Sequence, residues 1–144
     1  MWQINKSFIS RINKHFDSRG GKGNFTMLFD NFPHHIQTEI LTLLGVSTEE
    51  EKPLIASYRK GYYCLLLTTH KLWWNNPNNN TLFVNLENII ETRTQIKYMN
   101  PKCDIFRLGI ITKDDKQLEF QMEAGRPFSG VWNVILMIIG LRKE

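Results

Sequence analysis

The sequence predicts an α+β fold in which a run of short antiparallel strands lies between helical segments. From residue 54 to residue 123, apolar residues recur at every second position within short segments separated by tight turns, which is typical of antiparallel strands. Before this region the apolar spacing is helical, and after it residues 128–141 are apolar over a broad helical face. These three observations predict two N-terminal helices, seven strands and one C-terminal helix.

The first helix is predicted within residues 1–16. Its apolar stripe has a four-residue spacing and consists of Ile4, Phe8, Ile12 and Phe16. Three glycines within residues 20–23 end the pattern, because glycine does not sustain a helix. The segment is also basic, and three roles remain open for it: packing on the domain, contact with a partner or an anionic membrane surface, and targeting as a transit peptide.

The second helix is predicted to follow Asn31, whose side chain can cap it, with Pro33 in its first turn. Its apolar stripe ends at Leu44, and Gly45 is expected to close the helix as a C-terminal cap. Residues 47–51 form an acidic linker. We therefore divide the chain into a helical extension, residues 1–52, packed on a domain of residues 53–144, the two forming one structural unit.

The seven predicted strands are residues 54–58, 63–69, 71–74, 81–86, 92–99, 104–112 and 117–123. Because side chains alternate between the faces of a strand, one of Trp73 and Trp74 should enter the core while the other covers an outer surface. In the last strand Leu118, Phe120 and Met122 are predicted to face inward, and Gln117, Glu119, Gln121 and Glu123 outward.

The order of elements and three motifs resemble the pleckstrin-homology (PH) superfold. YCLLLTTHKLWW resembles a hairpin of GRAM and bacterial PH-like domains, LFVNLENI resembles their following strand, and Trp132 lies where PH domains usually carry a tryptophan. The resemblance covers about residues 54–141. It implies a seven-stranded, partly open antiparallel barrel closed by the C-terminal helix. It implies no single function, because PH-like domains bind lipids, peptides and whole proteins.

The net charge of +4 lies in the first 24 residues, since the other 120 carry 13 basic and 13 acidic side chains. A nucleic-acid protein needs a basic face on its folded domain, so we expect no nucleic-acid partner. No apolar run approaches the roughly 20 residues of a membrane span, and no secretory signal is recognisable. With Cys64 and Cys103 predicted to be buried reduced thiols, we expect a soluble, cytoplasmic protein.

No catalytic, cofactor-binding or metal site is predicted. The sequence contains no Gly-rich phosphate loop, nucleophile elbow or HExxH motif. The adjacent His34 and His35 would point about 100° apart on a helix and so cannot chelate one ion. We therefore predict a protein that is not an enzyme and acts by binding.

The predicted role is protein binding, since exposed aromatic residues anchor interfaces, although packing against the N-terminal helices would explain the extra aromatic residues equally well. The candidate interface residues are Trp73, Trp74, Asp114, Asp115, Glu119 and Glu123. Their acidic members would complement a basic toxin, so the specific hypothesis is a bacterial immunity protein that inhibits a cognate toxin. The alternative is a membrane- or phosphoinositide-binding PH/GRAM-type domain that uses Arg59 and Lys60, although a polyphosphate headgroup requires more charge-assisted bonds than two cations supply.

Overall fold

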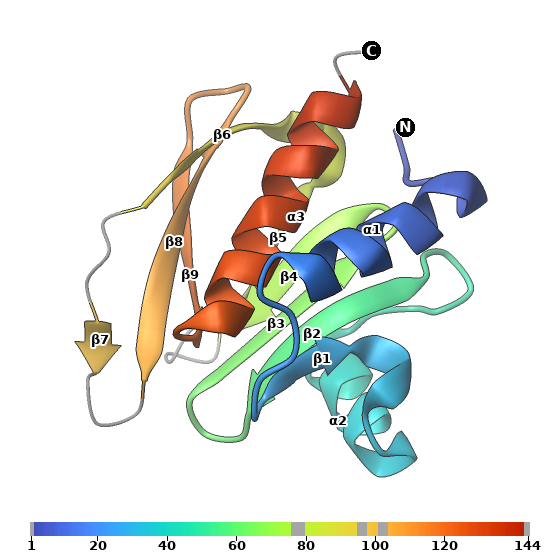
Figure 1. The fold of residues 1–144 in the computed structure, drawn as a ribbon, viewed down its shortest axis with the longest axis vertical. Helices are drawn as coiled ribbons and strands as arrows, with labels where there is room; N and C mark the ends of the chain where they lie inside the picture. The colour runs from blue at the N-terminus through green and yellow to red at the C-terminus, as the bar shows by residue number, and fades with distance from the viewer. Residues whose placement is uncertain (1, 76–79, 95–97, 101–103, 143–144) are drawn as a thin grey trace.

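The computed structural model describes residues 2–75, 80–94, 98–100 and 104–142 and confirms the α+β class (Figure 1). The described α-helices are α1 (Lys6–Ser18), α2 (His34–Leu44) and α3 (Arg126–Arg142), with short 3-10 helices η1 (Phe29–Asn31) and η2 (Leu86–Asn88). The described strands are β1 (Thr26–Leu28), β2 (Pro53–Arg59), β3 (Tyr63–Thr68), β4 (Lys71–Asn75), β5 (Thr81–Asn85), β6 (Ile89–Arg93), β7 (Tyr98–Asn100), β8 (Ile105–Thr112) and β9 (Gln117–Glu123).

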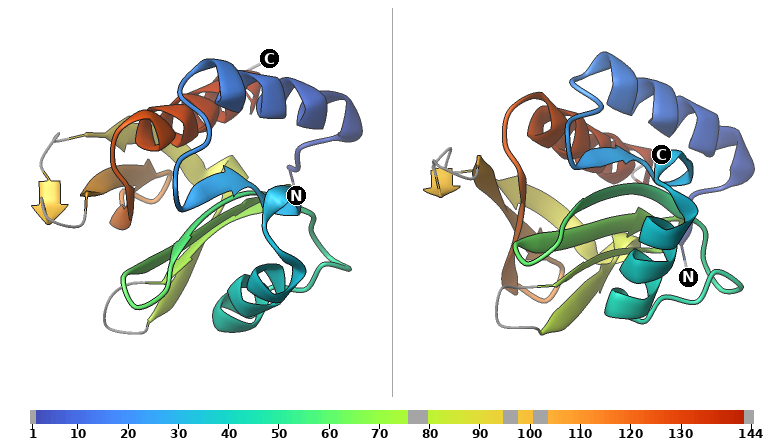
Figure 2. Two further views of the ribbon diagram at one scale, coloured as in Figure 1. Left: turned by 60° about the horizontal axis from the view of Figure 1, so that its bottom comes forward. Right: turned by 90° about the horizontal axis from the view of Figure 1, so that it is seen from below.

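The described strands form two antiparallel sheets. The first has the order β1-β2-β3-β4-β5. In the second, β9 pairs along one edge of β8, while β6 and β7 pair with different parts of its other edge. Helix α3 lies across both sheets with α1 beside it, and α2 covers the opposite side of the first sheet (Figure 2).

The main core lies between the two sheets and under α3. Trp74 from the first sheet, Phe120 from the second and Ile135 from α3 are almost fully buried in it. A smaller core forms where α2 packs Ile40 against Leu66 on the other face of the first sheet. Strand β3 is therefore covered on both faces, which explains why its sequence is continuously apolar instead of alternating.

The predicted layout of a seven-stranded barrel with two N-terminal helices is not matched. The described chain contains nine strands in two sheets that do not close into a barrel. The predicted strand 92–99 is replaced by β6, which begins at Ile89, and by the separate β7. The extension also contributes β1, which pairs with β2 at the edge of the first sheet. Such a short strand gains its stability from pairing with β2, which local periodicity does not reveal.

The ends of the N-terminal helices differ from the prediction in two places. Helix α1 begins only after Asn5, whose Oδ1 accepts the N–H of Phe8 at 3.2 Å and caps the helix. Asn31 does not cap α2, because it belongs to η1, and Pro33 occupies the cap position without a side-chain hydrogen bond. Gly45 does end α2, in the left-handed conformation with φ of 73°.

The structure places α1 on the body of the protein. Ile12 and Phe16 are completely buried and belong to the main core. Gly130 of α3 permits this approach, since a Cβ atom there would lie 2.6 Å from the backbone nitrogen of Gly21. In the described part of the chain no helix is both long enough and apolar enough to cross a membrane.

Candidate interaction surfaces

The acidic residues of the predicted interface do not form one surface. Glu123 was expected to face outward, but its side chain is buried and only 8% of the residue is exposed. Its carboxylate accepts the N–H groups of Asn24 at 2.8 Å and Phe25 at 2.9 Å, and the hydroxyl of Thr26 at 2.9 Å. The chain before β1 covers this end of β9, so the outward assignment of Glu123 was wrong.

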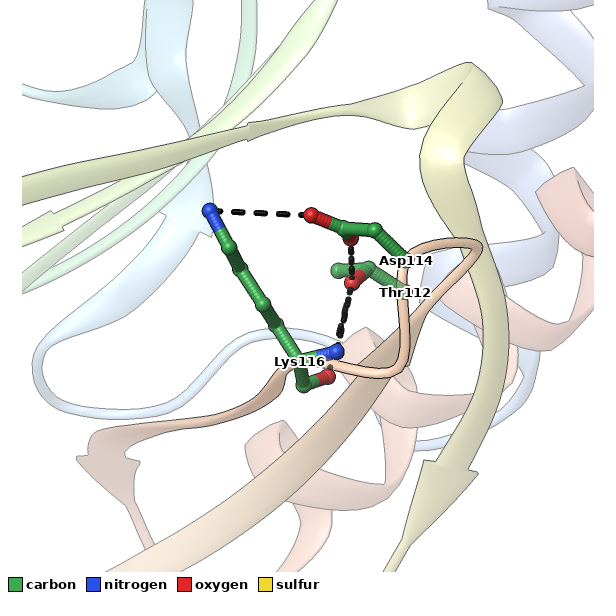
Figure 3. Close-up of polar contacts among 3 residues, drawn as sticks. All are labelled: Thr112, Asp114 and Lys116. Atoms are coloured by element: carbon green, nitrogen blue, oxygen red, sulfur yellow. Dashed lines mark hydrogen bonds and ion pairs between the residues drawn. The ribbon is translucent and has the colours of Figure 1, made fainter.

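The remaining acidic residues are involved in local contacts along the β8–β9 hairpin. Glu119 forms an ion pair with Arg107 at 2.8 Å. In the hairpin turn, Thr112 donates its hydroxyl to Asp114, whose Oδ2 lies 3.6 Å from Nζ of Lys116 (Figure 3).

The contacts in this turn also stabilise the ionised form of Asp114. The hydrogen bond from Thr112 is the main cause that lowers the pKa of Asp114, and the charge of Lys116 adds to it. The neighbouring Asp115 adopts a left-handed backbone with φ of 62°. With Glu123 buried and two of the other carboxylates near cations, the hairpin presents no continuous acidic patch to a basic partner.

The Arg59–Gly61 turn is the predicted contact for an anionic ligand, and two aromatic rings hold one of its two cations, Arg59. The guanidinium of Arg59 lies 4.8 Å from the ring centroid of Phe25 and 4.3 Å from that of Tyr62. Lys60 is exposed, and Gly61 makes the tight turn with φ of 84°. Because cation–π contacts already engage Arg59, the turn is not an open cluster of basic side chains.

The two tryptophans lie on opposite faces of β4, as strand alternation requires. Trp74 is 1% exposed and packs near Phe120 in the main core, with the ring centroids 6.0 Å apart. Trp73 is half-buried at the margin of the α2 core. The structure thus leaves only Trp73 of this pair available to an interface.

A group of partly exposed side chains includes Trp73, and we call it the β4–β5 surface. It consists of Lys71, Trp73 and Phe83, and Leu43 lies near it because the Leu43 carbonyl accepts the hydroxyl of Thr81 in β5. The rings of Trp73 and Phe83 face each other across the strand pair with centroids 4.9 Å apart, and Nζ of Lys71 lies 5.1 Å and 4.6 Å from them. Phe83 is 49% exposed, and Leu43 at the end of α2 is 44% exposed.

A buried carboxylate fixes the orientation of Trp73. Glu51 is 6% exposed and accepts Nε1–H of Trp73 at 2.8 Å, together with the hydroxyl of Thr68. The sequence places Glu51 in an acidic linker, and nothing in its local pattern distinguishes it from its neighbours Glu49 and Glu50. Its role arises because the linker runs past the β3–β4 turn.

The prediction from sequence missed Lys71 and Phe83 as surface residues. A signal was present, because the alternation of TLFVN places Phe83 opposite the core-facing Leu82 and Val84. What the sequence does not specify is the register that pairs Phe83 directly with Trp73. That pairing converts two separate aromatic residues into one contact surface.

Of the two cysteines predicted to be buried thiols, the structure describes one. Cys64 is a free, buried cysteine of β3, and burial raises the pKa of its thiol to about 12. Cys103 lies outside the described residues. Among the residues that are described, no group of three or more His, Cys, Asp or Glu side chains is placed to hold a metal ion.

Comparison with known proteins does not assign the chain to a family: no family model matches it, and no curated protein or solved structure is significantly similar to it.

Proposed function

We propose that the chain is a non-catalytic, PH-like binding module of the cytoplasm that recognises another protein through the β4–β5 surface. The PH-like relationship is supported by the order of strands β2 to β9 followed by the C-terminal helix α3. The observation that carries the functional proposal is the contact of the exposed Phe83 with the half-buried Trp73, with the ammonium of Lys71 over both rings.

This surface has the composition of a binding hot spot. Aromatic side chains dominate the binding energy of many interfaces because they bury a large area at a small cost in conformational entropy. Trp73 is already held by Glu51, and Phe83 by its contact with Trp73. A partner therefore has little further ordering to perform when it covers them.

The chemistry of the surface also indicates the kind of partner. An apolar side chain packed on Phe83 would exclude water, and a carboxylate beside it would pair with Lys71 in that drier environment. A toxin neutralised by the chain as an immunity protein is the specific form of this hypothesis. The contact is then expected on the β4–β5 surface and not at the dispersed acidic residues of the β8–β9 hairpin.

The proposal is tested by affinity capture of the tagged protein from its native cells, followed by mass spectrometry and titration of the purified partner. Phe83→Ala should weaken that complex at least about 30-fold, the effect of losing a hot-spot residue worth about 2 kcal/mol. Ile90→Ala is the matched control, because Ile90 is an exposed apolar residue of the other sheet.

Capture of one stoichiometric protein whose affinity depends on Phe83 supports the proposal, and a toxic partner supports its specific form. Equal effects of Phe83→Ala and Ile90→Ala, or recovery of membrane lipid alone, would contradict it. Both variants should keep the free energy of unfolding within about 1 kcal/mol of the parent, since exposed side chains contribute little to it.

A further inference from the structure

A second surface, outside the β4–β5 surface, lies along the exposed side of α1. There a cleft of about 460 Å³ opens between α1 and the residue that precedes β2. Its polar lining consists of Lys6, Ser10, Asn13, Lys14 and Asp17 of α1, and Lys52. The volume is within the range of small-molecule sites, which is about 300–1,000 Å³.

The helical spacing gathers these side chains on one face. Residues three or four positions apart neighbour each other on a helix, and the α1 residues of the cleft follow that spacing, while Ile12 and Phe16 bury the other face against the core. Lys52 arrives from the linker before β2. The cleft thus exists only when α1 is docked.

The charges of the cleft are unbalanced. Three lysines line it, and Asp17 is its single acidic residue. None of the ion pairs within the described residues involves Lys6, Lys14 or Lys52. A concave site with excess positive charge attracts an anion that enters it.

Ser10 contributes an exposed hydroxyl to the same cleft, and such a hydroxyl can donate a hydrogen bond to an anionic oxygen.

We propose that this cleft binds a phosphorylated small molecule, with the lysines and the hydroxyl of Ser10 contacting the phosphate. Phosphate suits the site because it offers several acceptor oxygens to ammonium groups. The same chemistry occurs in a free sugar phosphate and in the glycerol phosphate headgroup of a lipid, and the experiment separates these sources. The site is distinct from the β4–β5 surface and does not depend on the protein-binding proposal.

The test uses the full chain in two binding assays. Calorimetric titration with fructose bisphosphate and with pyrophosphate measures binding of soluble phosphates. Cosedimentation with phosphatidylcholine vesicles, with and without phosphatidylglycerol, measures binding to a headgroup. Binding in either assay should weaken as salt is raised, because the contacts are ionic and partly exposed.

Variants of the cleft identify the site. Lys14→Glu should weaken binding about tenfold or more, whereas Lys113→Glu, an equal charge change at an exposed position of the β8–β9 turn, should alter it less than about twofold. Phe83→Ala should leave ligand binding unchanged. The urea midpoint of each variant shows that it is folded, and Lys52→Glu replaces Lys14→Glu should the latter not fold.

Binding of fructose bisphosphate that requires Lys14 supports a soluble ligand, and binding restricted to phosphatidylglycerol vesicles with the same requirement supports a lipid headgroup. The proposal is overturned by no binding in either assay. Equal losses in Lys14→Glu and Lys113→Glu would overturn it as well, because they would indicate general charge attraction instead of a site.

Discussion

Glu119 and Glu123 show how one residue type takes two roles on a single strand. Both belong to β9, four positions apart, and strand alternation places them on the same face. Glu119 is exposed beside Arg107, whereas Glu123 is buried under the chain that enters β1. The difference arises because residues 24–26 cover only one end of β9, and their donors converge on the Glu123 carboxylate.

Replacement of Glu123 should therefore destabilise the fold. Glu123→Ala leaves three donors of residues 24–26 without their acceptor, so the free energy of unfolding should fall by about 3 kcal/mol. Glu123→Gln keeps one acceptor oxygen and should lose less. Urea unfolding measures both, and Glu119→Ala, which removes an exposed ion pair, should stay within about 1 kcal/mol of the parent. Equal losses at the two positions would contradict this assignment.

Tyr58 should titrate at a higher pH than an exposed tyrosine. Burial, followed by its hydrogen bond to Glu39 at 3.1 Å, raises the pKa of Tyr58 from 10.0 to about 12. The folded-state pKa lies above the unfolded value. The protonated Tyr58 therefore contributes to the free energy of unfolding below pH 10, and this contribution is lost as the pH rises towards 12.

Absorbance titration of tyrosinate, compared between the parent and Tyr58→Phe, isolates this group. Glu39→Gln should lower the pKa of Tyr58 only partway to 10.0, because burial is the larger cause. An unchanged pKa in Glu39→Gln would show that the hydrogen bond and the charge of Glu39 have no effect.

At the scale of elements, the strands whose alternation is local were predicted best. Strand β9 has the predicted bounds of residues 117–123, and β2, β3, β4 and β8 differ by a residue or two at their ends. The C-terminal helix is also confirmed. The errors fall where pairing with a distant strand decides the structure: β1 exists through its ladder with β2, and β6 starts at Ile89 because that residue pairs with Thr112 of β8.

The packing of α1 on α3 depends on Gly130, and substitutions of Gly130 and Gly140, both in α3, test it. A methyl group at Gly130 would lie 2.6 Å from the nitrogen of Gly21 and 3.1 Å from the ring of Phe16. Gly130→Ala should therefore destabilise the protein by about 2 kcal/mol through overpacking. A Cβ atom at Gly140 would meet nothing within 4 Å beyond the backbone of its own helix, so Gly140→Ala should stabilise the protein by about 0.5–1 kcal/mol through helix propensity.

Thermal and urea unfolding of the two variants give the comparison directly. Opposite signs for Gly130→Ala and Gly140→Ala would match the packing of residues 16–21 against α3. Stabilisation by both substitutions would mean that α1 does not approach α3 this closely.

At the scale of the whole molecule, segments from both ends of the chain share the main core. Ile12 of α1 is buried in the same cluster as Trp74 of the first sheet, Phe120 of the second and Ile138 of α3. The extension therefore contributes to the same hydrophobic core as the strands.

This shared core predicts that α1 and the sheets unfold in one cooperative transition. Urea curves followed by far-ultraviolet circular dichroism and by tryptophan fluorescence should coincide. Ile12→Ala should lower the free energy of unfolding by about 2–4 kcal/mol without changing the slope of the curves. An early loss of helical signal, with Ile12→Ala affecting that phase alone, would show that α1 is an independent element.

The sequence by itself determined the fold class, most strand positions, the apolar stripe of α1 and the placement of the two tryptophans on opposite faces. These features follow from periodicities of two and 3.6 residues, which depend only on local backbone geometry. The tertiary structure decided the rest: it buried Glu51 and Glu123, paired Trp73 with Phe83, and brought Lys52 to the lysines of α1. Each of these contacts joins residues that are separated in the sequence, so long-range packing and strand pairing determine them. Both proposed binding surfaces consist of such contacts.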